Sequence, residues 1–343
     1  MSDVTVAAFP RTLRDNPYCD LLYREVAATG TRVADDGELS PGWLVRNRGR
    51  VDVLHLHWPE LYYRGPSARV TTRSAASFVG ALLVARALGY RIVWTVHNEV
   101  PHERGGLVDR VLRWCLLRTA RPVVHAETAR LALRRAGRRA AVVPHGHYID
   151  AYPHDLDEGE ARRRLGIAAD ATVFLHFGQL RAYKGVPELL HAFAALTDRR
   201  ARLVIAGKPV DASIGTIAEH AAARDSRITT HLGRVDDAAV QVYFEAADWV
   251  VLPYRHVLTS GSALLALSFG RPVIVPRLGC LVELADAGGV VAYDPDDPRA
   301  LAAALTRAAS LDARAWRPRA LATARRFDWQ TIARAYDRIF AGA

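Results

Sequence analysis

The sequence is poor in cysteine and contains no long apolar run. Its three cysteines, Cys19, Cys115 and Cys280, lie far apart, and no Cys-x-x-Cys pair occurs. This spacing excludes a disulfide framework and a cysteine zinc site, so we expect three buried, reduced thiols. No segment reaches the ~18 consecutive apolar residues that a membrane-spanning helix needs. Strand-like residues begin at Val4 without a basic leader, which predicts a cytoplasmic protein.

Lysine is also scarce, and the charge is unevenly distributed. The net charge is +10, but only two of the 46 basic residues, Lys184 and Lys208, are lysines. Residues 1–150 contain 22 arginines against 14 acidic residues and so hold most of the positive excess. One explanation is an anionic partner, such as lipid headgroups, a lipid-linked pyrophosphate or nucleic acid. The other is a solvated basic face that has no ligand.

Apolar runs alternate with helical patterns along the whole chain. This alternation predicts parallel sheets that are buried on both faces, and therefore an α/β fold. The polar segment 148–159 predicts a linker between two domains, and residues 316–340 predict a helix. The predicted strands are Val4–Phe9, Val51–His57, Arg91–His97, Val123–Ala126, Ala141–Pro144, Thr172–Gly178, Arg202–Ala206, Ile228–Leu232, Trp249–Leu252, Pro272–Val275 and Gly289–Ala292. The predicted helices are Tyr18–Ala28, Ser74–Leu88, Leu107–Ala120, Val186–Leu196, Ile214–Arg224, Asp237–Ala246 and Ser262–Phe269.

A glycine followed by two cations stands directly after one predicted strand and before a helix. In the segment 177–185, Gly178 allows the backbone to approach a ligand closely, and Arg181 and Lys184 supply positive charge near the helix start. A diphosphate suits this arrangement, because a helix N-terminus also favours negative charge. Ligands of open parallel sheets bind beyond the carboxyl ends of the strands, where this segment lies. The alternative is a basic, solvated turn.

A second junction between strand and helix, residues 253–262, carries hydroxyl groups and a glycine. Thr259, Ser260 and Ser262 offer hydroxyls, and Gly261 keeps the first amides of the helix accessible. Serine and threonine are also ordinary N-cap residues, so the alternative is that they serve only the helix. Two phosphate-suited helix starts in one domain favour a phosphate ligand.

These two junctions, together with residues 270–274 and Glu283, resemble those of the GT-B glycosyltransferases. Residues 143–146 are similar to the family's entry into its second domain, and residues 327–329 to the start of its final helix. The resemblance covers nearly the whole chain. It implies two Rossmann-like domains whose parallel sheets face each other across a cleft.

The resemblance also implies a role for each part of the chain. Residues 1–150 would bind the acceptor, residues 151–325 would bind the nucleotide-sugar donor, and residues 326–343 would form a helix that crosses back to the first domain. Arg181 and Lys184 would hold the diphosphate. The full set of implied donor-binding residues is Gly178, Arg181, Lys184, Lys208, Arg234, Val235, Tyr254, Thr259, Ser260, Gly261 and Ser262.

Departures from the family pattern bear on the stereochemistry. Retaining members carry two glutamates around the helix where this chain has Val257 and Leu265, and Gln179 replaces the usual arginine. We therefore expect inversion. The segment 95–103 resembles the His-Asn segment of β-mannosyltransferases that use GDP-mannose on lipid-linked acceptors. This implies transfer of a hexose, namely mannose, to a β-linkage on a lipid-linked or other glycan in polysaccharide biosynthesis.

Inversion requires a general base that deprotonates the acceptor hydroxyl. Glu103 and Glu99 are the favoured candidates for the base, and Glu60 and His97 are the others. The resemblance implies that His97 orients the donor sugar instead of accepting the proton. Trp58 follows a predicted strand and is expected either to contact the acceptor or only to pack. The acceptor-binding residues that we predict are Asn16, Tyr18, His57, Trp58 and Glu60.

The sequence contains no His-Glu-x-x-His or similar motif, so we expect neither a metal nor a cofactor, the nucleotide-sugar being a substrate. The expected partners are the donor, a glycan or lipid-linked acceptor and, by peripheral contact at the inner face of the membrane, anionic lipid. Nucleic acid is not expected, because no pattern of interleaved aromatic and basic residues is present. Two other functions remain open: a retaining GT-B glycosyltransferase that uses a UDP- or other NDP-sugar on a soluble acceptor, and a non-catalytic module that binds anionic surfaces.

Overall fold

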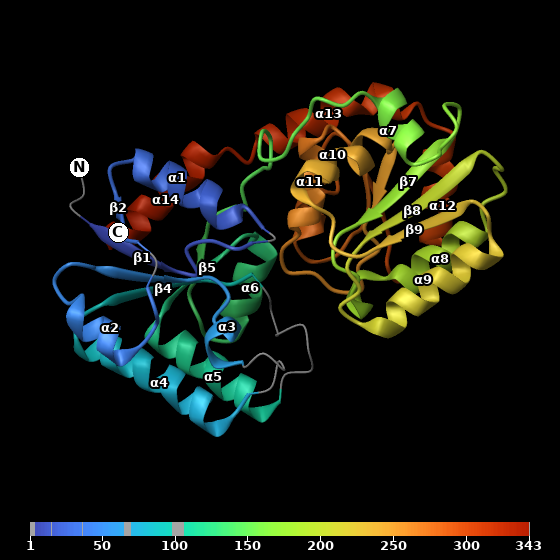
Figure 1. Cartoon of the computed structure of the whole chain (residues 1–343). Helices are drawn as coiled ribbons and strands as arrows, with labels where there is room; N and C mark the ends of the chain where they lie inside the picture. Colours follow the sequence, from blue (N-terminus) through green and yellow to red (C-terminus); the bar gives the residue numbers. More distant parts are fainter. Residues whose placement is uncertain (1–3, 15, 36, 65–69, 98–105, 343) are drawn as a thin grey trace. The chain divides into compact units, whose positions relative to one another are not determined.

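The computed structural model describes the chain except for residues 1–3, 15, 36, 65–69, 98–105 and 343. It divides into two compact units (Figure 1). The first consists of Met1–Gly146 and Asp328–Ala343, and the second of His147–Phe327. The divisions therefore fall after residues 146 and 327, where the sequence suggests 150 and 325. The chain leaves the first unit once and returns to it with its last helix.

The first unit is built around a six-stranded sheet with the strand order β2-β1-β3-β4-β5-β6. Every pairing in it is parallel; Val6 of β1 pairs with Val53 of β3, and Val53 pairs with Arg91 of β4. The inner strands are buried along almost their whole length, as a sheet covered on both faces requires. The strands are β1 (Thr5–Phe9), β2 (Arg32–Val33), β3 (Val53–Leu56), β4 (Arg91–Thr95), β5 (Arg121–Val124) and β6 (Ala141–Val142).

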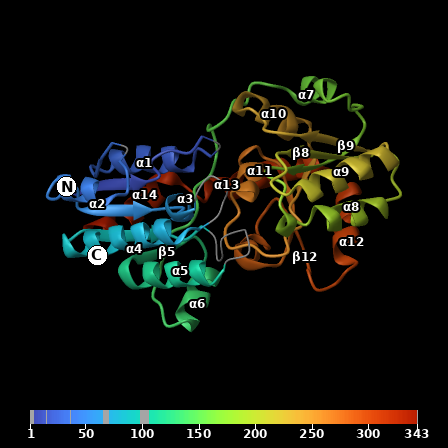
Figure 2. The same cartoon turned by 60° about the horizontal axis from the view of Figure 1, so that its bottom comes forward.

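Helices cover both faces of this sheet. Helices α1 and α14 lie side by side on one face, and α2, α4 and α5 lie on the other (Figures 1 and 2). Helix α14 buries Trp329, Ile332, Tyr336 and Phe340, which are spaced three or four residues apart and form one stripe. The helices of this unit are α1 (Tyr18–Ala28), α2 (Pro41–Arg46), α3 (Glu60–Tyr63), α4 (Thr72–Ala87), α5 (Leu107–Thr119), α6 (Glu127–Arg135) and α14 (Trp329–Ala341).

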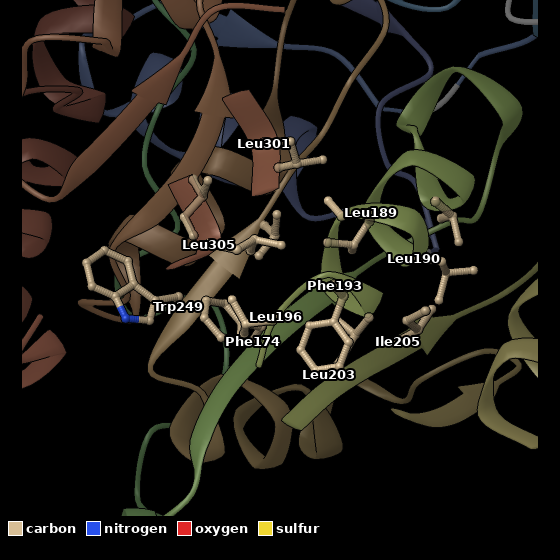
Figure 3. Close-up of a cluster of buried hydrophobic side chains, with 14 of the residues drawn as sticks. Phe174, Leu189, Leu190, Phe193, Leu196, Leu203, Ile205, Trp249, Leu301 and Leu305 are labelled. Carbon is tan, nitrogen blue, oxygen red and sulfur yellow. The ribbon is translucent and has the colours of Figure 1, made fainter. Parts of the chain in front are cut away.

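The second unit is also built around six parallel strands, in the order β12-β11-β10-β7-β8-β9. Its core contains Phe174 of β7, Trp249 of β10, Phe193 of α8 and Leu305 of α12, all fully buried (Figure 3). The strands are β7 (Thr172–Phe177), β8 (Ala201–Gly207), β9 (Ile228–Leu232), β10 (Trp249–Val251), β11 (Val273–Pro276) and β12 (Val290–Tyr293).

Helices α8, α9 and α12 cover one face of the second sheet, and α7, α10, α11 and α13 cover the other (Figures 1 and 2). Two short 3₁₀ helices, η1 and η2, follow β7 and β11. The helices are α7 (Glu158–Arg164), η1 (Ala182–Lys184), α8 (Val186–Ala194), α9 (Ala212–Arg224), α10 (Asp237–Ala246), α11 (Gly261–Ser268), η2 (Gly279–Leu284), α12 (Ala300–Ala309) and α13 (Ala313–Arg325).

The α/β fold with two parallel sheets is thus confirmed, but one predicted element is wrong. Residues 316–340 do not form a single helix; they belong to α13 and α14. The reason is Asp328, whose carboxylate accepts a hydrogen bond from the backbone N–H of Thr331 (2.8 Å) and so starts a new helix. Six of these strands and α-helices were not predicted: β2, α2, α3, α6, α7 and α12. Most of them span fewer than ten residues, and α7 begins within the segment that was predicted as a linker.

The cysteines are free, but their burial differs from the expectation. Cys19 is buried in α1, whereas Cys115 and Cys280 are only half-buried. Among the residues that the structure describes, no helix is long and apolar enough to cross a membrane.

Candidate active site

The order of the strands places a candidate ligand site in the second unit. From β7 the chain continues to β8 and β9 on one side, whereas β10, β11 and β12 lie on the other. The loops after β7 and β10 therefore diverge from neighbouring strands, which is the position where open α/β sheets bind ligands. The two junctions singled out in the sequence, 177–185 and 253–262, are these two loops.

Gly178 brings three of the predicted donor-binding residues together. Its backbone has φ +113°, and a Cβ atom there would lie 3.2 Å from Nζ of Lys184 and 3.7 Å from Oγ of Ser262. A side chain at this position would therefore be strained and would fill the space between the ammonium and the start of α11. The end of β8 also packs tightly against Gly178, because a Cβ on Gly207 would lie 2.0 Å from the carbonyl oxygen of Gly178.

Lys184 is a buried cation with no carboxylate partner among the described residues. Lys184 is the last residue of η1, its side chain is buried, and its Nζ lies 5.8 Å from the centre of the Tyr254 ring. Burial, and secondarily the positive charge of Arg181, lower the pKa of Lys184 to about 8. An ammonium held in this way is stabilised by an anion, and a diphosphate supplies one.

The start of α11 supplies hydrogen-bond donors beside Lys184. The hydroxyl of Ser260 accepts from the backbone N–H of Ala263 (3.2 Å), so Ser260 is an N-cap, as the alternative interpretation of this residue proposed. Oγ1 of Thr259 is buried and has no hydrogen-bond partner in the described part of the chain. The first amides of α11, those of Gly261 and Ser262, point out of the helix start, as in any α-helix. The junction therefore combines a cap with unused donors.

The remaining predicted donor residues stand at the same edge of the sheet. Arg181 is half-buried, and its guanidinium donates to Oε1 of Gln179 (3.2 Å and 3.3 Å), the residue that replaces the family's arginine. Lys208 is exposed directly after β8. Arg234 follows β9 and lies 3.8 Å from the carboxylate of Asp236, and Val235 beside it is half-buried.

In the first unit, several aromatic and imidazole rings gather where the strands end. His97 follows β4, and the indole of Trp58 stacks on its ring with 4.1 Å between centres and 11° between planes. Nε2 of His97 lies 3.1 Å from Nδ1 of His57, and both side chains are buried. Although five buried histidines occur in this unit, the residues described include no group of three or more histidine, cysteine or acidic side chains that could hold a metal.

The predicted acceptor-binding residues fall into two groups. Tyr18 and His57 are buried, with 0% and 1% of their surface exposed, although His57 lines the pocket described below. Trp58 and Glu60 are half-buried and can reach a ligand. Oδ1 of Asn16 accepts a hydrogen bond from the backbone N–H of Tyr18 (3.0 Å), which matches a plain turn and helix start.

A pocket in the first unit collects His57, Glu60 and His97 from the predicted set. Trp94, Asp109 and Arg113 also line it. Asp109 is buried on α5 and forms an ion pair with Arg64 (2.8 Å). Asp109 was not predicted from the sequence. A signal for it was present, because Asp109 lies on the same face of the predicted helix as the apolar residues Leu112 and Leu116. The two favoured base candidates, Glu99 and Glu103, lie outside the described residues.

Comparison with known proteins identifies the family. Residues 171–310 match the family described as glycosyl transferases group 1. Two relatives from Xanthomonas campestris pv. campestris, each a GDP-mannose:glycolipid 4-beta-D-mannosyltransferase, are 34% identical over 249 residues and 33% identical over 264 residues. These alignments cover 70% and 74% of this chain and 65% and 70% of the two relatives.

The solved structures agree at the level of the fold. The structure of Anabaena Alr3699/HepE in complex with UDP-glucose superposes with a TM-score of 0.75 and 17% identity, covering 99% of each chain. The chain belongs to the group 1 glycosyl transferases and has the GT-B fold. It is a glycosyltransferase, and the alternative of a non-catalytic surface-binding module is thereby set aside.

Proposed function

We propose that this glycosyltransferase transfers mannose from GDP-mannose, with inversion to a β-linkage, onto a glycan acceptor carried by a lipid. Two observations support the donor and the outcome. The two relatives described above are named for GDP-mannose and a β-linked mannosyl product. In the second unit, half-buried Val257 and buried Leu265 stand where retaining members carry carboxylates.

The observation that carries the proposal is the buried cation beside Gly178. When the bond between the anomeric carbon and the diphosphate oxygen breaks, the electron pair stays on the diphosphate. Lys184 and Arg181 would offset this charge, and the hydroxyl of Thr259 and the first amides of α11 would donate hydrogen bonds to it. The same residues supply the charge that a metal ion supplies in other transferases, so we expect metal independence.

The acceptor oxygen would attack the anomeric carbon from the opposite side as the diphosphate leaves. Its proton would pass to a carboxylate of the first unit, for which Glu103, Glu99 and Glu60 are the candidates. His97, which lines the same pocket as Glu60, would orient the sugar. One new C–O bond forms and one breaks, which inverts the configuration of the anomeric carbon in a single step.

A thermal-shift comparison of GDP, UDP, dTDP and ADP tests the nucleotide. At a hundredfold excess over its Kd a ligand stabilises the folded state by about 2.7 kcal/mol. We expect the largest rise in Tm with GDP, and a smaller rise after Lys184→Ala. A rise with UDP but none with GDP would support the alternative, a retaining enzyme that uses a UDP-sugar.

The lowered pKa of Lys184 predicts a pH dependence of nucleotide binding. The diphosphate binds the ammonium form, so the affinity is fully present below the pKa of about 8 and falls as pH rises through it. Between pH 7 and pH 9 the Kd for GDP should rise roughly tenfold, because about a tenth of Lys184 stays protonated at pH 9. Calorimetry should show that Lys184→Met binds GDP more weakly but with an affinity that hardly changes with pH, because this variant lacks the titrating ammonium. An equally steep profile in that variant would rule Lys184 out as the titrating group.

A lipid-linked acceptor would lie at a membrane surface, so we expect this enzyme to contact the membrane. Helix α5 has a surface suited to this contact. Leu107, Val108, Val111 and Trp114 are exposed on it, with 45–69% of their surface accessible. Arg118 stacks on Trp114 at 4.7 Å from the ring centre. Exposed apolar side chains with arginines among them are typical of helices that lie in the headgroup region of anionic membranes.

Vesicle binding tests this surface. We expect sedimentation with vesicles that contain anionic phospholipid, little with neutral phosphatidylcholine vesicles, and release by salt, because screening acts over ~8–10 Å at ordinary ionic strength. Replacing four exposed arginines of α5 and α6 by glutamine should weaken binding severalfold: Arg110, Arg118, Arg134 and Arg135. The matched control replaces four exposed arginines of the second unit: Arg199, Arg200, Arg224 and Arg307. Equal loss in both variants, or equal binding to both kinds of vesicle, would overturn the proposed contact.

A further inference from the structure

A continuous line of hydrogen bonds runs through the interior of the first unit, and the function proposed above leaves most of it unused. It connects the end of β4 with α14 by way of α1 and β3. We call it the histidine–tyrosine relay. Its members, in order, are His97, His57, Tyr23, His55, Thr95, Tyr336 and Tyr18.

Every step of the relay from His97 to Tyr336 is a contact of hydrogen-bond length. His97 Nε2 lies 3.1 Å from His57 Nδ1, and the Tyr23 hydroxyl lies 2.7 Å from His57 Nε2. The same hydroxyl lies 2.7 Å from Nδ1 of His55, whose Nε2 lies 2.8 Å from Oγ1 of Thr95. That oxygen lies 2.8 Å from the Tyr336 hydroxyl. The final contact, from Tyr336 to Tyr18, is longer at 3.4 Å.

The whole relay is buried, and its imidazoles are neutral. None of the seven side chains exposes more than 7% of its surface. Burial lowers the pKa of His55 to about 3 and holds the pKa values of His57 and His97 well below the ordinary value. A neutral imidazole has one N–H donor and one acceptor nitrogen, so each ring can make its two bonds in only two ways.

Counting hydrogens shows that the three imidazoles are coupled. Both nitrogens of His57 and of His55 are engaged, so each ring donates to one neighbour and accepts from the other. Tyr23 has a single hydroxyl hydrogen, and accepting from both rings would leave that buried hydrogen without an acceptor. Tyr23 therefore accepts a hydrogen bond from one ring and donates one to the other. As a result, all hydrogens of the relay point in the same direction along it. The three rings are then either all protonated on Nδ1 or all protonated on Nε2.

The two directions differ at the end that Tyr336 forms. If Thr95 donates to His55, the hydroxyl hydrogen of Tyr336 binds Thr95 at 2.8 Å. In the opposite direction Thr95 donates to Tyr336, whose own hydrogen then has only Tyr18 at 3.4 Å as an acceptor within the described residues. A buried hydroxyl hydrogen without a good acceptor is destabilising. The first direction is therefore favoured, and it protonates all three rings on Nδ1.

We propose that the relay is a positioning device that holds His97 in the Nδ1–H tautomer, so that His97 offers a hydrogen-bond donor to the substrate at the end of β4. Tyr23, His55 and Thr95 act through His57, which lines the same pocket as His97 and joins them to it. This inference rests on the proposed glycosyl transfer, in which His97 orients the donor sugar. A ring in the other tautomer would present a lone pair there and could only accept a hydrogen bond from a sugar hydroxyl.

Histidine nitrogen-15 NMR of the unliganded protein tests the tautomers directly. Two-bond proton–nitrogen correlations distinguish Nδ1–H from Nε2–H rings, and we expect Nδ1–H for His55, His57 and His97. This pattern is distinctive, because free neutral imidazole favours Nε2–H. A mixture of tautomers among the three rings would overturn the coupling, and Nε2–H in all three would overturn the assigned direction.

Two matched substitutions test the consequence for catalysis. Tyr23→Phe cuts the relay between His57 and His55, so His97 should shift toward Nε2–H and kcat should fall about fivefold, as the productive fraction falls. Tyr90→Phe removes a buried hydroxyl of the first unit that lies outside the relay and donates to the carbonyl oxygen of Leu44 (2.7 Å), so it should leave the His97 signal and kcat unchanged. The Kd for GDP should stay the same in both variants.

The readouts separate the inference from the proposed function. Unchanged kcat in Tyr23→Phe with an altered His97 tautomer, or equal losses in the two variants, would contradict a positioning role. Failure of GDP to bind even the wild-type protein would instead count against the proposed function and leave the NMR result standing. If Tyr23→Phe does not fold, the wild-type spectrum alone decides the tautomers.

Discussion

Lys184→Ala is expected to lower turnover a hundredfold or more, and Arg181→Ala to do the same. Each cation would meet the negative charge that develops on the leaving diphosphate, and removing one such charge-assisted contact costs roughly 2–4 kcal/mol of transition-state stabilisation. Steady-state assays with GDP-mannose and a lipid-linked glycan measure the loss. The fold should remain intact, because Lys184 has no ion-pair partner among the described residues and Arg181 binds only the side chain of Gln179 there.

The control for both variants is Arg224→Ala, which removes an exposed arginine from the last turn of α9. It should leave turnover unchanged. Activity should also survive EDTA in the wild-type enzyme, since the two cations do the work of a metal. Wild-type activity in Lys184→Ala and Arg181→Ala, or a strict requirement for Mg²⁺, would contradict the assignment of the diphosphate site.

Replacing the general base by glutamine is expected to lower turnover by roughly 10²–10⁴ with donor binding nearly unchanged. The substitution keeps the shape of the side chain but removes the proton acceptor. Glu103→Gln and Glu99→Gln are the first variants to test, and Glu60→Gln the next. Glu60 begins α3 and lines the pocket that also contains His97, which makes it a base candidate within the described part of the chain.

The pattern of loss among the three glutamine variants identifies the base. One variant should lose nearly all turnover with its Kd for GDP kept, while the other two keep most of it. Asp286→Ala, at an exposed carboxylate of the second unit, is the control for loss of negative charge. If all three glutamine variants stay active, none of the three carboxylates is the base, and an inverting mechanism that uses one of them is excluded.

The clustering of the predicted donor-binding residues could be inferred from the sequence because its signals are local. Gly178, Lys184 and the residues that open α11 stand directly after strands that read as continuous apolar runs, so the order of elements alone carries them to one edge of the sheet. The structure adds how close they come: a Cβ atom on Gly178 would lie only 3.2 Å from Nζ of Lys184. Helices with long regular patterns, such as α1 and α10, were predicted with the bounds that they have.

The relay in the first unit was not predictable in this way. Thr95 and Tyr336 are 241 residues apart in the sequence, and Tyr23 of α1 joins His55 of β3 to His57, which follows that strand. No short motif records such contacts, since each of these residues also fits an ordinary buried position. The break between α13 and α14 was missed for a related reason: a single capping aspartate, Asp328, outweighs the helical pattern on either side of it.

The most direct measurement of the proposed activity is anomeric NMR of the product formed from GDP-mannose and a lipid-linked glycan. The donor carries an α-linked mannose, so inversion predicts a new β-mannosidic signal, with release of one GDP for each linkage formed. Retention of the α configuration, or transfer from a UDP-sugar with none from GDP-mannose, would contradict the proposal.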